Sequence, residues 1–467
     1  MDRKLNPTRE LPGSAAVAIQ LEGSRGPLET LAHFTDLPHV CLLHSAALDH
    51  PLSRYSFLAA DPVTVITERA EGWPSARQRV RATTRSGALS FPGLPPLQGG
   101  WIGWFSYELG TAFDRTVRHQ YEPVTVPDVA LGLYDWVIAW DHETAEIWLV
   151  SSGVDSSGIR DRGRARRRAD MALERWCAAP AGMRLPQACH PPAQLQSDFT
   201  ADAYQRAIAA GIEHVLAGDI FQVNLAQRFS TPFAASPVSL YRELCERTAA
   251  PMAAFIQHDG IHVLSASPQR FLRFDPRTRH VETRPIKGTR PRHADAAEDT
   301  RLARELQASD KDRAENVMIV DLQRNDLSRV CLPGSVRVPT LNALESHPTV
   351  HHLVSTVTGE LGPDRDALDL LAATFPGGSI TGAPKLRAMA VIGELEPVAR
   401  GVYSGAIGWI GLDGAMDINI AIRTVTIADG IATFHAGGAV TAQSNPADEY
   451  RESLDKARAL VAAMIAA

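Results

Sequence analysis

Hydrophobic residues in the first third of the chain come in short runs that Gly and Pro separate. Between residues 37 and 150 these runs are HVCLLHSA, RYSFLAADP, GGWIGWFSYELG and YDWVIAWD. Short apolar runs bounded by turn residues are typical of β-strands joined by tight turns. A basic, Ala-rich stretch, GIRDRGRARRRADMALERWCAA, follows them and predicts a helix. We therefore predict a β-rich N-terminal region over residues 1–180.

The pattern breaks at residues 180–197. The segment PAGMRLPQACHPPAQLQS is rich in Pro and has no periodicity, so we interpret it as a linker, with a surface loop inside one domain as the alternative. Thr200 then stands where an N-cap belongs, and apolar residues recur at helical spacing from Tyr204 and Ile208 onward. Residues 198–467 are predicted to form a second domain.

Strands and long helices alternate in the rest of the chain. The predicted strands are IFQVNLAQRF, IHVLSAS, HHLVSTVTGEL, GVYSGAIGWIG and IATFHAGG. The predicted helices lie around residues 297–308, 310–326, 365–374, 383–393 and 446–466. Many of the strands are joined by turns too short for a parallel crossover. The pattern therefore predicts an α+β fold with much antiparallel sheet.

Composition and charge narrow the class of partner. The 467 residues are 45% hydrophobic and 21% charged, as in an ordinary globular protein, and the net charge of -6 is too mild to favour nucleic acid or an anionic membrane. The five cysteines are scattered without CxxC spacing, so we expect neither disulfides nor a zinc site. The N-terminus has no apolar run long enough for a signal peptide or a membrane span, which favours a cytoplasmic location.

Two predicted helices have acidic residues three positions apart on one face. The first pair is Asp312 and Glu315, and the second is Glu449 and Glu452, with Lys456 one turn further on. Two such pairs can form an oxygen cage for Mg²⁺, which prefers carboxylates and water. The alternative is a solvated face with i,i+4 ion pairs, and spacing alone favours it.

A second candidate is the lysine of TRPIKGTRPR. We expect Lys287 in a turn between Pro285 and Gly288, with Arg284 and Arg290 on either side. Neighbouring cations make the amine easier to deprotonate, and a neutral amine is a nucleophile. The alternative is a solvated loop lysine.

Other polar residues stand where the pattern is otherwise apolar. The segment FPGGSITGAPKLRAM predicts a Gly-rich turn before a helix, which can present backbone N–H groups to an anion but lacks the P-loop spacing. His352, Tyr403 and Arg423 lie in predicted strands. A buried Arg423 needs an anionic partner, whereas His352 alone is more often a structural histidine.

In this order, the segments resemble the chorismate-binding family. The family includes anthranilate synthase component I, aminodeoxychorismate synthase component I, isochorismate synthase and salicylate synthase. The similar segments are GDIFQVNLAQRF, SASPQRFL, TRPIKGTRPR, DRAENVMIVDLQRNDLSRVC, HHLVSTVTGEL, FPGGSITGAPKLRAM, GVYSGAIGWIG, DINIAIRTV and AGGAVTAQSNPADEYRESLDKA. The resemblance implies a two-layer, β-sandwich-like core flanked by helices, with residues 198–467 as the catalytic domain. RYSFLAADP and GGWIGWFSYELG resemble the partner-binding or regulatory half of the large synthase subunits.

The resemblance also implies roles for single residues. Glu315 and Glu452 match the Mg²⁺ ligands, with Asp312 and Glu449 in or beside the coordination shell. His352 matches a residue that helps the C4 hydroxyl of chorismate to leave as water. The expected contacts to chorismate are Tyr403 and Arg423 to the enolpyruvyl carboxylate, the backbone of Gly437 and Gly438, the side chain of Lys456, and the turn residues Ser379 and Thr381.

Two positions distinguish the branches of the family. In the isochorismate and salicylate synthases of the family that this chain resembles, a lysine that activates water stands at the position of Gln222. Gln222 has an amide side chain, which cannot take a proton. The anthranilate synthases of this family have a motif similar to PIAGT where this chain has PIKGT. Lys287 thus stands in place of a small residue. The resemblance thus implies covalent attack by Lys287 at C2 and amination at C4, which gives 4-amino-4-deoxychorismate for p-aminobenzoate and folate synthesis.

The chain departs from the family pattern at two points. Most members of the family have a motif similar to SPE, whose carboxylate moves protons, whereas this chain has Gln269 at the position of the glutamate. The second difference is AGGA, which ends in Ala439, in place of AGGG. No Gly-x-Cys-x-Gly elbow of a glutaminase occurs, so a separate glutamine amidotransferase subunit is the expected source of ammonia. Two alternatives stay open, which are an anthranilate synthase component I and a non-catalytic chorismate-binding paralogue.

Overall fold

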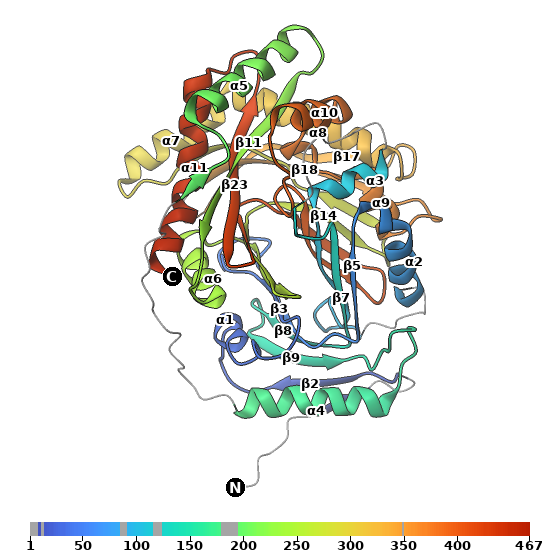
Figure 1. Ribbon diagram of the computed structural model, residues 1–467. Helices are drawn as coiled ribbons and strands as arrows, with labels where there is room; N and C mark the ends of the chain where they lie inside the picture. The colour runs from blue at the N-terminus through green and yellow to red at the C-terminus, as the bar shows by residue number, and fades with distance from the viewer. Residues whose placement is uncertain (1–7, 11–13, 85–90, 115–123, 179–194, 348–349) are drawn as a thin grey trace.

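The computed structural model describes residues 8–10, 14–84, 91–114, 124–178, 195–347 and 350–467 (Figure 1). Within these ranges the chain forms two antiparallel sheets with helices around them, which confirms the predicted α+β, two-layer fold. Helices α5 and α11 cover β11 and β23, and α4 lies along β9 on the opposite side of the molecule (Figure 1). No helix in the described ranges combines the length and the apolar content that crossing a bilayer requires.

The larger sheet has 13 strands in the described residues. In order across the sheet they are β1 (Thr8–Glu10), β2 (Val17–Leu21), β9 (Glu146–Ser151), β8 (Trp136–Asp141), β4 (Tyr55–Ala59), β3 (Cys41–His44), β12 (Met252–His258), β13 (Ile261–Ser267), β22 (Thr424–Ala428), β23 (Ile431–Val440), β11 (Gln222–Pro232) and β10 (Gln196–Ser197), with β19 (Gly382–Ala383) also on β11.

The smaller sheet has 10 strands. They are β16 (Ile286–Pro291), β18 (Val350–Glu360), β15 (His280–Thr283), β14 (Arg270–Asp275), β21 (Met416–Ile420), β20 (Ala406–Gly411), β6 (Gly100–Phe105), β7 (Val129–Tyr134) and β5 (Thr64–Glu68), with β17 (Arg337–Ser346) also on β18.

Both sheets contain strands from both parts of the chain. In the larger sheet β3 pairs with β12, and in the smaller one β6 pairs with β20. The core between the sheets is shared as well, since Phe57 and Trp104 from the first part pack in one cluster with Ile256 and Trp409 from the second. The division at residues 180–197 stays a prediction, and the N-terminal strands are structural partners of the C-terminal ones.

The helices are α1 (Pro27–Leu31), α2 (Trp73–Thr84), α3 (Gly110–Phe113), α4 (Arg162–Ala178), α5 (Ala201–Leu216), α6 (Pro237–Arg247), α7 (Ala296–Ala308), α8 (Asp310–Ser328), α9 (Ala367–Thr374), α10 (Lys385–Leu395) and α11 (Pro446–Ala466). The five helices predicted beyond residue 290 are confirmed as α7 to α11. Thr200 caps α5 as predicted, by accepting a hydrogen bond from the backbone N–H of Ala203. Helix α2 was missed because its buried face alternates Trp73 and Val80 with small residues, which weakens the apolar signal.

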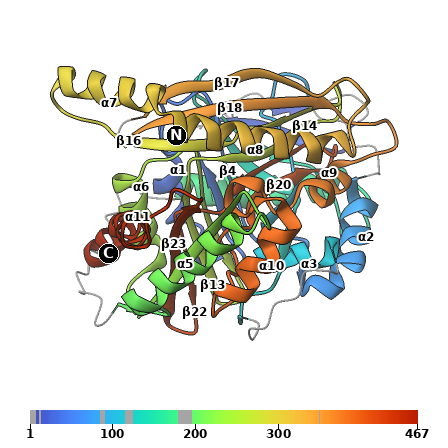
Figure 2. The same cartoon turned by 90° about the horizontal axis from the view of Figure 1, so that it is seen from above.

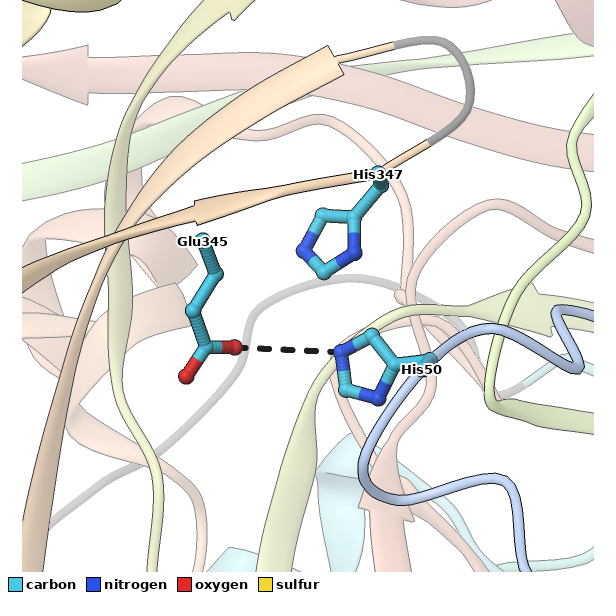
Figure 3. Close-up of side chains that lie close together, drawn as sticks. All are labelled: His50, Glu345 and His347. Carbon is cyan, nitrogen blue, oxygen red and sulfur yellow. Dashed lines mark ion pairs between the residues drawn. The ribbon is translucent and has the colours of Figure 1, made fainter.

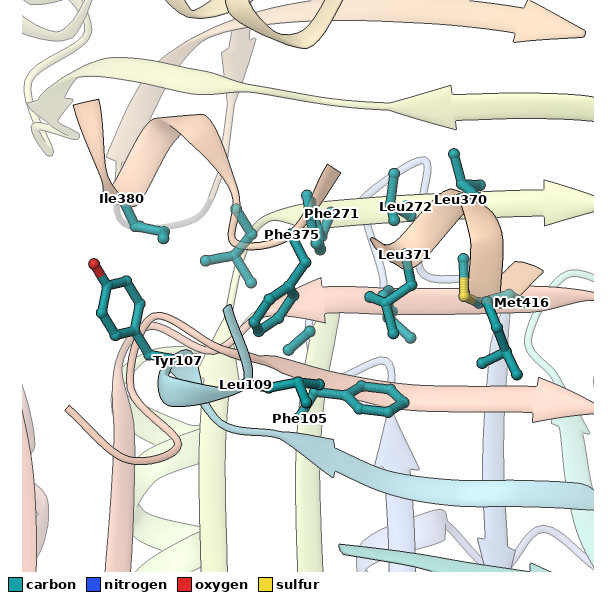
Figure 4. Close-up of a cluster of buried hydrophobic side chains, with 14 of the residues drawn as sticks. Phe105, Tyr107, Leu109, Phe271, Leu272, Leu370, Leu371, Phe375, Ile380 and Met416 are labelled. Carbon is teal, nitrogen blue, oxygen red and sulfur yellow. The ribbon is translucent and has the colours of Figure 1, made fainter. Parts of the chain in front are cut away.

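A cluster of aromatic and aliphatic side chains joins the N-terminal segment to the second half (Figure 4). Phe105, Tyr107 and Leu109 follow one another at the end of β6 and are buried against Phe375 and Phe271 from the C-terminal part. Burying side chains of this size contributes about 1.5–3 kcal/mol each. The segment GWFSYEL is therefore packed into the core of the C-terminal part.

Candidate active site

Two acidic residues of α11 lie against the end of β23, where the backbone has to be glycine. A Cβ atom on Gly438 would lie 2.8 Å from Oε2 of Glu449 and 3.4 Å from Oε1 of Glu452. Glu449 is buried and accepts a hydrogen bond from the Ser444 hydroxyl at 2.7 Å. Since Gly438 has no side chain, both carboxylates can converge on this strand.

Lys456 occupies the other side of the same group. Its Nζ lies 2.7 Å from Oε1 of Glu452 and donates a hydrogen bond to the carbonyl of Gly437 at 2.9 Å. Partial desolvation acts to raise the pKa of Glu452, but the Lys456 ammonium holds it below its usual value, and the two side chains are 52% and 50% exposed. The predicted contact residue Lys456 thus lies directly on a predicted metal ligand.

Glu315 reaches the group from α8. Burial raises its pKa, the amines of Lys287 and Lys311 lower it, and the carboxylates of Asp312 and Glu452 raise it again. These mutual effects place charges from α8, α11 and β16 within electrostatic range of one another. Of Glu315, Glu449 and Glu452, only Glu452 forms an ion pair in the described residues, so the group fits an oxygen-binding cation such as Mg²⁺. Asp312 lies further out, where its Oδ2 is 3.4 Å from Arg290.

Lys287 lies in a strand and not, as the sequence led us to expect, in a turn. It belongs to β16 opposite Leu353, and the pairing shifts by one residue between Lys287 and Thr289. Gly288 provides this bulge with a φ of +80°, and a Cβ there would come within 2.9 Å of Asp312. The expectation was wrong because a bulged strand uses the same Gly as a turn.

The environment of Lys287 favours its neutral form. Burial is the largest cause and lowers the pKa of the amine to about 8, while Glu315 raises it and Lys456 lowers it further. The lysine is thus in electrostatic contact with both the carboxylates and the second cation. An amine with such a pKa is a competent nucleophile at mildly alkaline pH.

His352 lies in β18 as predicted, across from Thr289. Its Nδ1 is 2.9 Å from the Thr289 hydroxyl, and its Nε2 is buried with no hydrogen-bond partner in the described residues. Burial and the nearby charge of Arg423 lower its pKa well below the ordinary value. The ring is therefore neutral and one nitrogen is left for a ligand.

Arg423 lies between β21 and β22 with a φ of +50°, outside the strand predicted for it. Burial lowers the pKa of its guanidinium, and no carboxylate in the described residues forms an ion pair with it. Arg423 is partly exposed, so an anion can reach it, and a partly buried cation without a partner is stabilised when an anion binds it. This supports the expectation that Arg423 binds a carboxylate.

Tyr403 lies in the turn before β20, also outside its predicted strand. Its ring stacks on His435, with centroids 4.9 Å apart and planes at 8°. Burial raises the pKa of its hydroxyl, and the charge of Lys456 lowers it. The tyrosine is thus held flat within electrostatic range of the Lys456 amine.

Amides and hydroxyls form another part of the wall. The amide of Gln269 donates to the hydroxyl of Ser379 at 3.0 Å, and the hydroxyl of Thr381 donates to the carbonyl of Gly377 at 2.9 Å. Gln222 is fully buried, and neither its Oε1 nor its Nε2 has a hydrogen-bond partner in the described ranges. An unpaired buried amide costs about 1–3 kcal/mol, which points to a polar ligand at Gln222.

Arg400 is the central residue that the sequence did not predict. Its side chain is fully buried, pairs with both oxygens of Glu396 at 2.5 and 2.8 Å, and donates to the carbonyls of Ile380 and Asn224. Glu108, from the N-terminal part, accepts hydrogen bonds from the backbone N–H groups of Arg400 and the next residue at 2.8 and 3.0 Å. The i,i+4 spacing of Glu396 and Arg400 in an apolar stretch was the available signal.

His50, Glu345 and His347 form a cluster with metal-binding residue types (Figure 3). Nδ1 of His50 accepts a hydrogen bond from the backbone N–H of Leu52 at 2.9 Å, so the proton of the neutral ring lies on Nε2, which faces Glu345 at 3.8 Å. A protonated nitrogen cannot bind a metal, and Arg284 already binds Glu345. We interpret the cluster as a hydrogen-bonded group and not as the magnesium site.

The cavities differ in their relation to the expected residues. One of about 520 Å³ lies between the two parts of the chain, and its lining contains none of the residues expected to bind chorismate or metal. Another of about 590 Å³ is lined by Tyr403 and His435. The candidate site is thus defined by its converging side chains and not by the largest open space.

The chain matches the family described as chorismate binding enzyme over residues 40–462. The chain belongs to this family. It is 41% identical over 435 residues to aminodeoxychorismate synthase component 1 of Salmonella typhimurium, covering 90% of this chain and 92% of that one. It is also 41% identical over 430 residues to anthranilate synthase component 1 of Streptomyces coelicolor, covering 91% and 83%.

A solved structure agrees with this assignment. The crystal structure of anthranilate synthase component I from Streptococcus pneumoniae is similar with a TM-score of 0.78 and 28% identity, covering 88% of this chain and 93% of that one. The implied fold of chorismate-utilising enzymes is thereby confirmed. The roles of single residues in the site stay predictions.

Proposed function

We propose that the chain is the chorismate-aminating component of an aminodeoxychorismate synthase. It would convert chorismate and ammonia to 4-amino-4-deoxychorismate, with Mg²⁺ as cofactor and a separate glutamine amidotransferase as ammonia source. The observation that supports this most is the amine of Lys287, with a pKa of about 8, beside Glu315 and Glu452. The 41% identity to a relative named aminodeoxychorismate synthase component 1 supports it independently.

The residues present fit a magnesium ion. Glu315, Glu449 and Glu452 would hold it, because Glu449 and Glu452 lie against Gly438, where a side chain would leave no room, and the charge of Glu315 interacts with that of Glu452. When bound, the ion supplies positive charge for the ring carboxylate of chorismate. Lys456 then has two anions nearby, the Glu452 carboxylate and the substrate, and Arg423 and Tyr403 would bind the second carboxylate of the substrate.

The chemistry assigned to Lys287 is a displacement with allylic shift. Its neutral Nζ forms a bond to C2, the ring double bond moves, and the C4–O bond breaks so that the hydroxyl leaves as water after taking up a proton. The nitrogen of ammonia then forms a bond to C4, the double bond moves back, and the C2–N bond to Lys287 breaks. Ammonia gives up one proton and the lysine returns to its amine.

His352 is the candidate proton donor for the leaving hydroxyl. Its Nε2 is free of protein partners, but burial and Arg423 keep its pKa low in the empty site. The two carboxylates of chorismate would offset the charge of Arg423 and raise the pKa of the imidazole. The substrate itself would thus bring His352 into the range where it can transfer a proton.

Product analysis tests the assignment directly. The purified chain is incubated with chorismate, Mg²⁺ and ammonium chloride at mildly alkaline pH, and the products are separated and identified by mass. We expect 4-amino-4-deoxychorismate with no loss of pyruvate. Fluorescent anthranilate as the main product would refute amination at C4 and support the second candidate, anthranilate synthase component I, which the relative from Streptomyces coelicolor also favours.

Gln269 motivates a third outcome, in which the chain binds chorismate but does not convert it. Its amide is buried and bonded to Ser379, in the place of a carboxylate that would move protons. A non-catalytic paralogue would bind chorismate without turnover and gain activity in Gln269→Glu. We expect turnover in the parent and a severalfold change at most in this variant.

A further inference from the structure

Phe434 and His435 are neighbours on β23, and each ring stacks on a different partner. Successive side chains of a strand point to opposite faces of the sheet. Phe434 stacks on Phe229 of β11, with ring centroids 5.1 Å apart and planes at 17°, in a cluster that includes Ala457 of α11. Figure 2 shows α11 beside β23. The Phe434 stack is therefore part of the hydrophobic core under this helix.

The His435 stack lies on the other face of β23. Its partner is Tyr403, with ring centroids 4.9 Å apart and planes at 8°. Both residues are 7% exposed, and both line the cavity of about 590 Å³. This stack thus combines a residue expected to bind chorismate with a histidine that the sequence did not mark, at the edge of an open space.

Side chains hold the ring of Tyr403, since the residue lies in the turn before β20 and outside the strands of the described structure. The guanidinium of Arg400 gives a second contact, with its central carbon 5.8 Å from the centroid of the Tyr403 ring. Arg400 is itself held by Glu396 and by backbone carbonyls. The phenol ring thus has a flat partner in His435 and a fixed cation in Arg400.

A hydrogen bond fixes the His435 ring in turn. The imidazole bonds the backbone carbonyl of Ala399, and Nε2 has no partner in the described ranges, so the donor is Nδ1. Burial lowers the pKa of His435 well below its ordinary value, and the charges of Arg228 and Arg400 lower it further. The ring is therefore neutral, with its proton on Nδ1, and its effect on Tyr403 is one of shape.

We propose that His435 is a positioning residue for Tyr403. Its imidazole, held at the Ala399 carbonyl, keeps the phenol ring in the plane in which the hydroxyl meets the enolpyruvyl carboxylate of chorismate. The proposal rests on the proposed function, in which Tyr403 binds this carboxylate. Because His435 acts through a contact remote from C2 and C4, it contributes equally to binding of the substrate and of the transition state.

The test uses the full chain with chorismate, Mg²⁺ and ammonium chloride. His435→Leu and His435→Asn remove the ring, whereas His435→Phe keeps a flat aromatic face. Phe434→Leu is the matched control, since it removes the other stack of the same strand. Circular dichroism shows which variants are folded before kcat and KM are measured. If one of the two variants without a ring does not fold, the other decides the test.

We expect His435→Leu and His435→Asn to raise KM by at least about tenfold, with kcat within about threefold of the parent. KM should stay within about threefold in His435→Phe and within about twofold in Phe434→Leu. An unchanged KM in the variants without a ring would overturn the proposal. A rise in His435→Phe as large as in His435→Leu would overturn it too, because Nε2 would then contact the ligand directly.

Tyr403→Phe shows whether His435 acts through the hydroxyl of Tyr403. In this background the hydroxyl is absent, so we expect His435→Leu to raise KM by less than about twofold, and the two effects are not additive. A rise as large as in the parent background would contradict the proposal, since His435 would then act independently of Tyr403.

Failure of the proposed function gives a different result. The parent would then form no 4-amino-4-deoxychorismate from ammonium. Calorimetry with chorismate and Mg²⁺ would still measure the dissociation constant of each variant, and the same pattern of weakened and retained binding would support the positioning role by itself. A parent that binds no chorismate would overturn both proposals.

Discussion

Arg400 is fully buried and Arg423 is partly buried, and their surroundings are opposite. Arg400 has Glu396 and backbone carbonyls for its guanidinium, and with Glu108 these residues form what we call the closed group. Arg423 forms no ion pair with a carboxylate in the described structure, and we call it, Lys287 and the glutamates Glu315, Glu449 and Glu452 the open group. A charged side chain that has its ion-pair and hydrogen-bond partners within the protein belongs to the fold, whereas a charged side chain without such partners is available to a ligand.

Replacing Lys287 by alanine would test the open group most severely. Removing the nucleophile should lower C4 amination by at least about a thousandfold and leave slow anthranilate formation, because the variant has the space that a small residue provides. The rate is measured with ammonium as nitrogen source, and the products are separated by chromatography. C4 amination at the parent rate would contradict the covalent role.

Replacing Arg400 by methionine would break the closed group. It leaves Glu396 buried without its cation, so we expect a loss of about 3–5 kcal/mol of stability. Urea unfolding followed by circular dichroism measures it. Arg423→Met is the matched control, since it removes an unpaired cation and should change stability by less than about 1 kcal/mol. Similar losses in the two variants would remove the distinction between the groups.

The same Arg423→Met variant should fail in a different assay. If Arg423 binds a carboxylate of chorismate, its loss removes a charge-assisted hydrogen bond of about 1.5–3 kcal/mol, which corresponds to a rise in KM of roughly ten- to a hundredfold. Steady-state kinetics with ammonium measure this. An unchanged KM would place Arg423 outside the substrate site.

Glu108 tests whether the closed group makes the stability of the fold depend on pH. Burial raises the pKa of Glu108 from 4.5 to about 7, although two backbone N–H groups oppose this. The folded state therefore binds more protons than the unfolded state in this interval, so the stability due to this residue is present below pH 4.5 and lost as the pH rises through about 7. Glu108→Gln should flatten the decline between about pH 5 and pH 8 by on the order of 2 kcal/mol. Parallel curves for parent and variant would contradict the raised pKa.

The sequence predicted the fold and the members of the open group better than their local geometry. The helices that carry Glu315, Glu449 and Glu452 formed as predicted, and a helix fixes which residues share a face, while the role of these residues as metal ligands stays a prediction. The bulge at Lys287 and the positive φ of Arg423 were not predictable, since both depend on pairing with strands far away in sequence.

The closed group shows the same limit more strongly. Arg400 donates hydrogen bonds to residues up to 176 positions away in the sequence. The carboxylate of Glu108 accepts a hydrogen bond from the backbone of Arg400, which is 292 positions away. No periodicity along the chain encodes such contacts. The i,i+4 ion pair with Glu396 was local enough to be recognised in the sequence.

Strands of the N-terminal part pair with strands of the C-terminal part in both sheets. A gene cut between residues 178 and 195 would deprive β3, β12, β6 and β20 of one bonded neighbour each. Each fragment would then expose an unpaired strand edge that matches the edge of the other. Two separately synthesised fragments would thus have complementary strand edges. The strand order of the two sheets would therefore allow the fragments to reassemble into the enzyme.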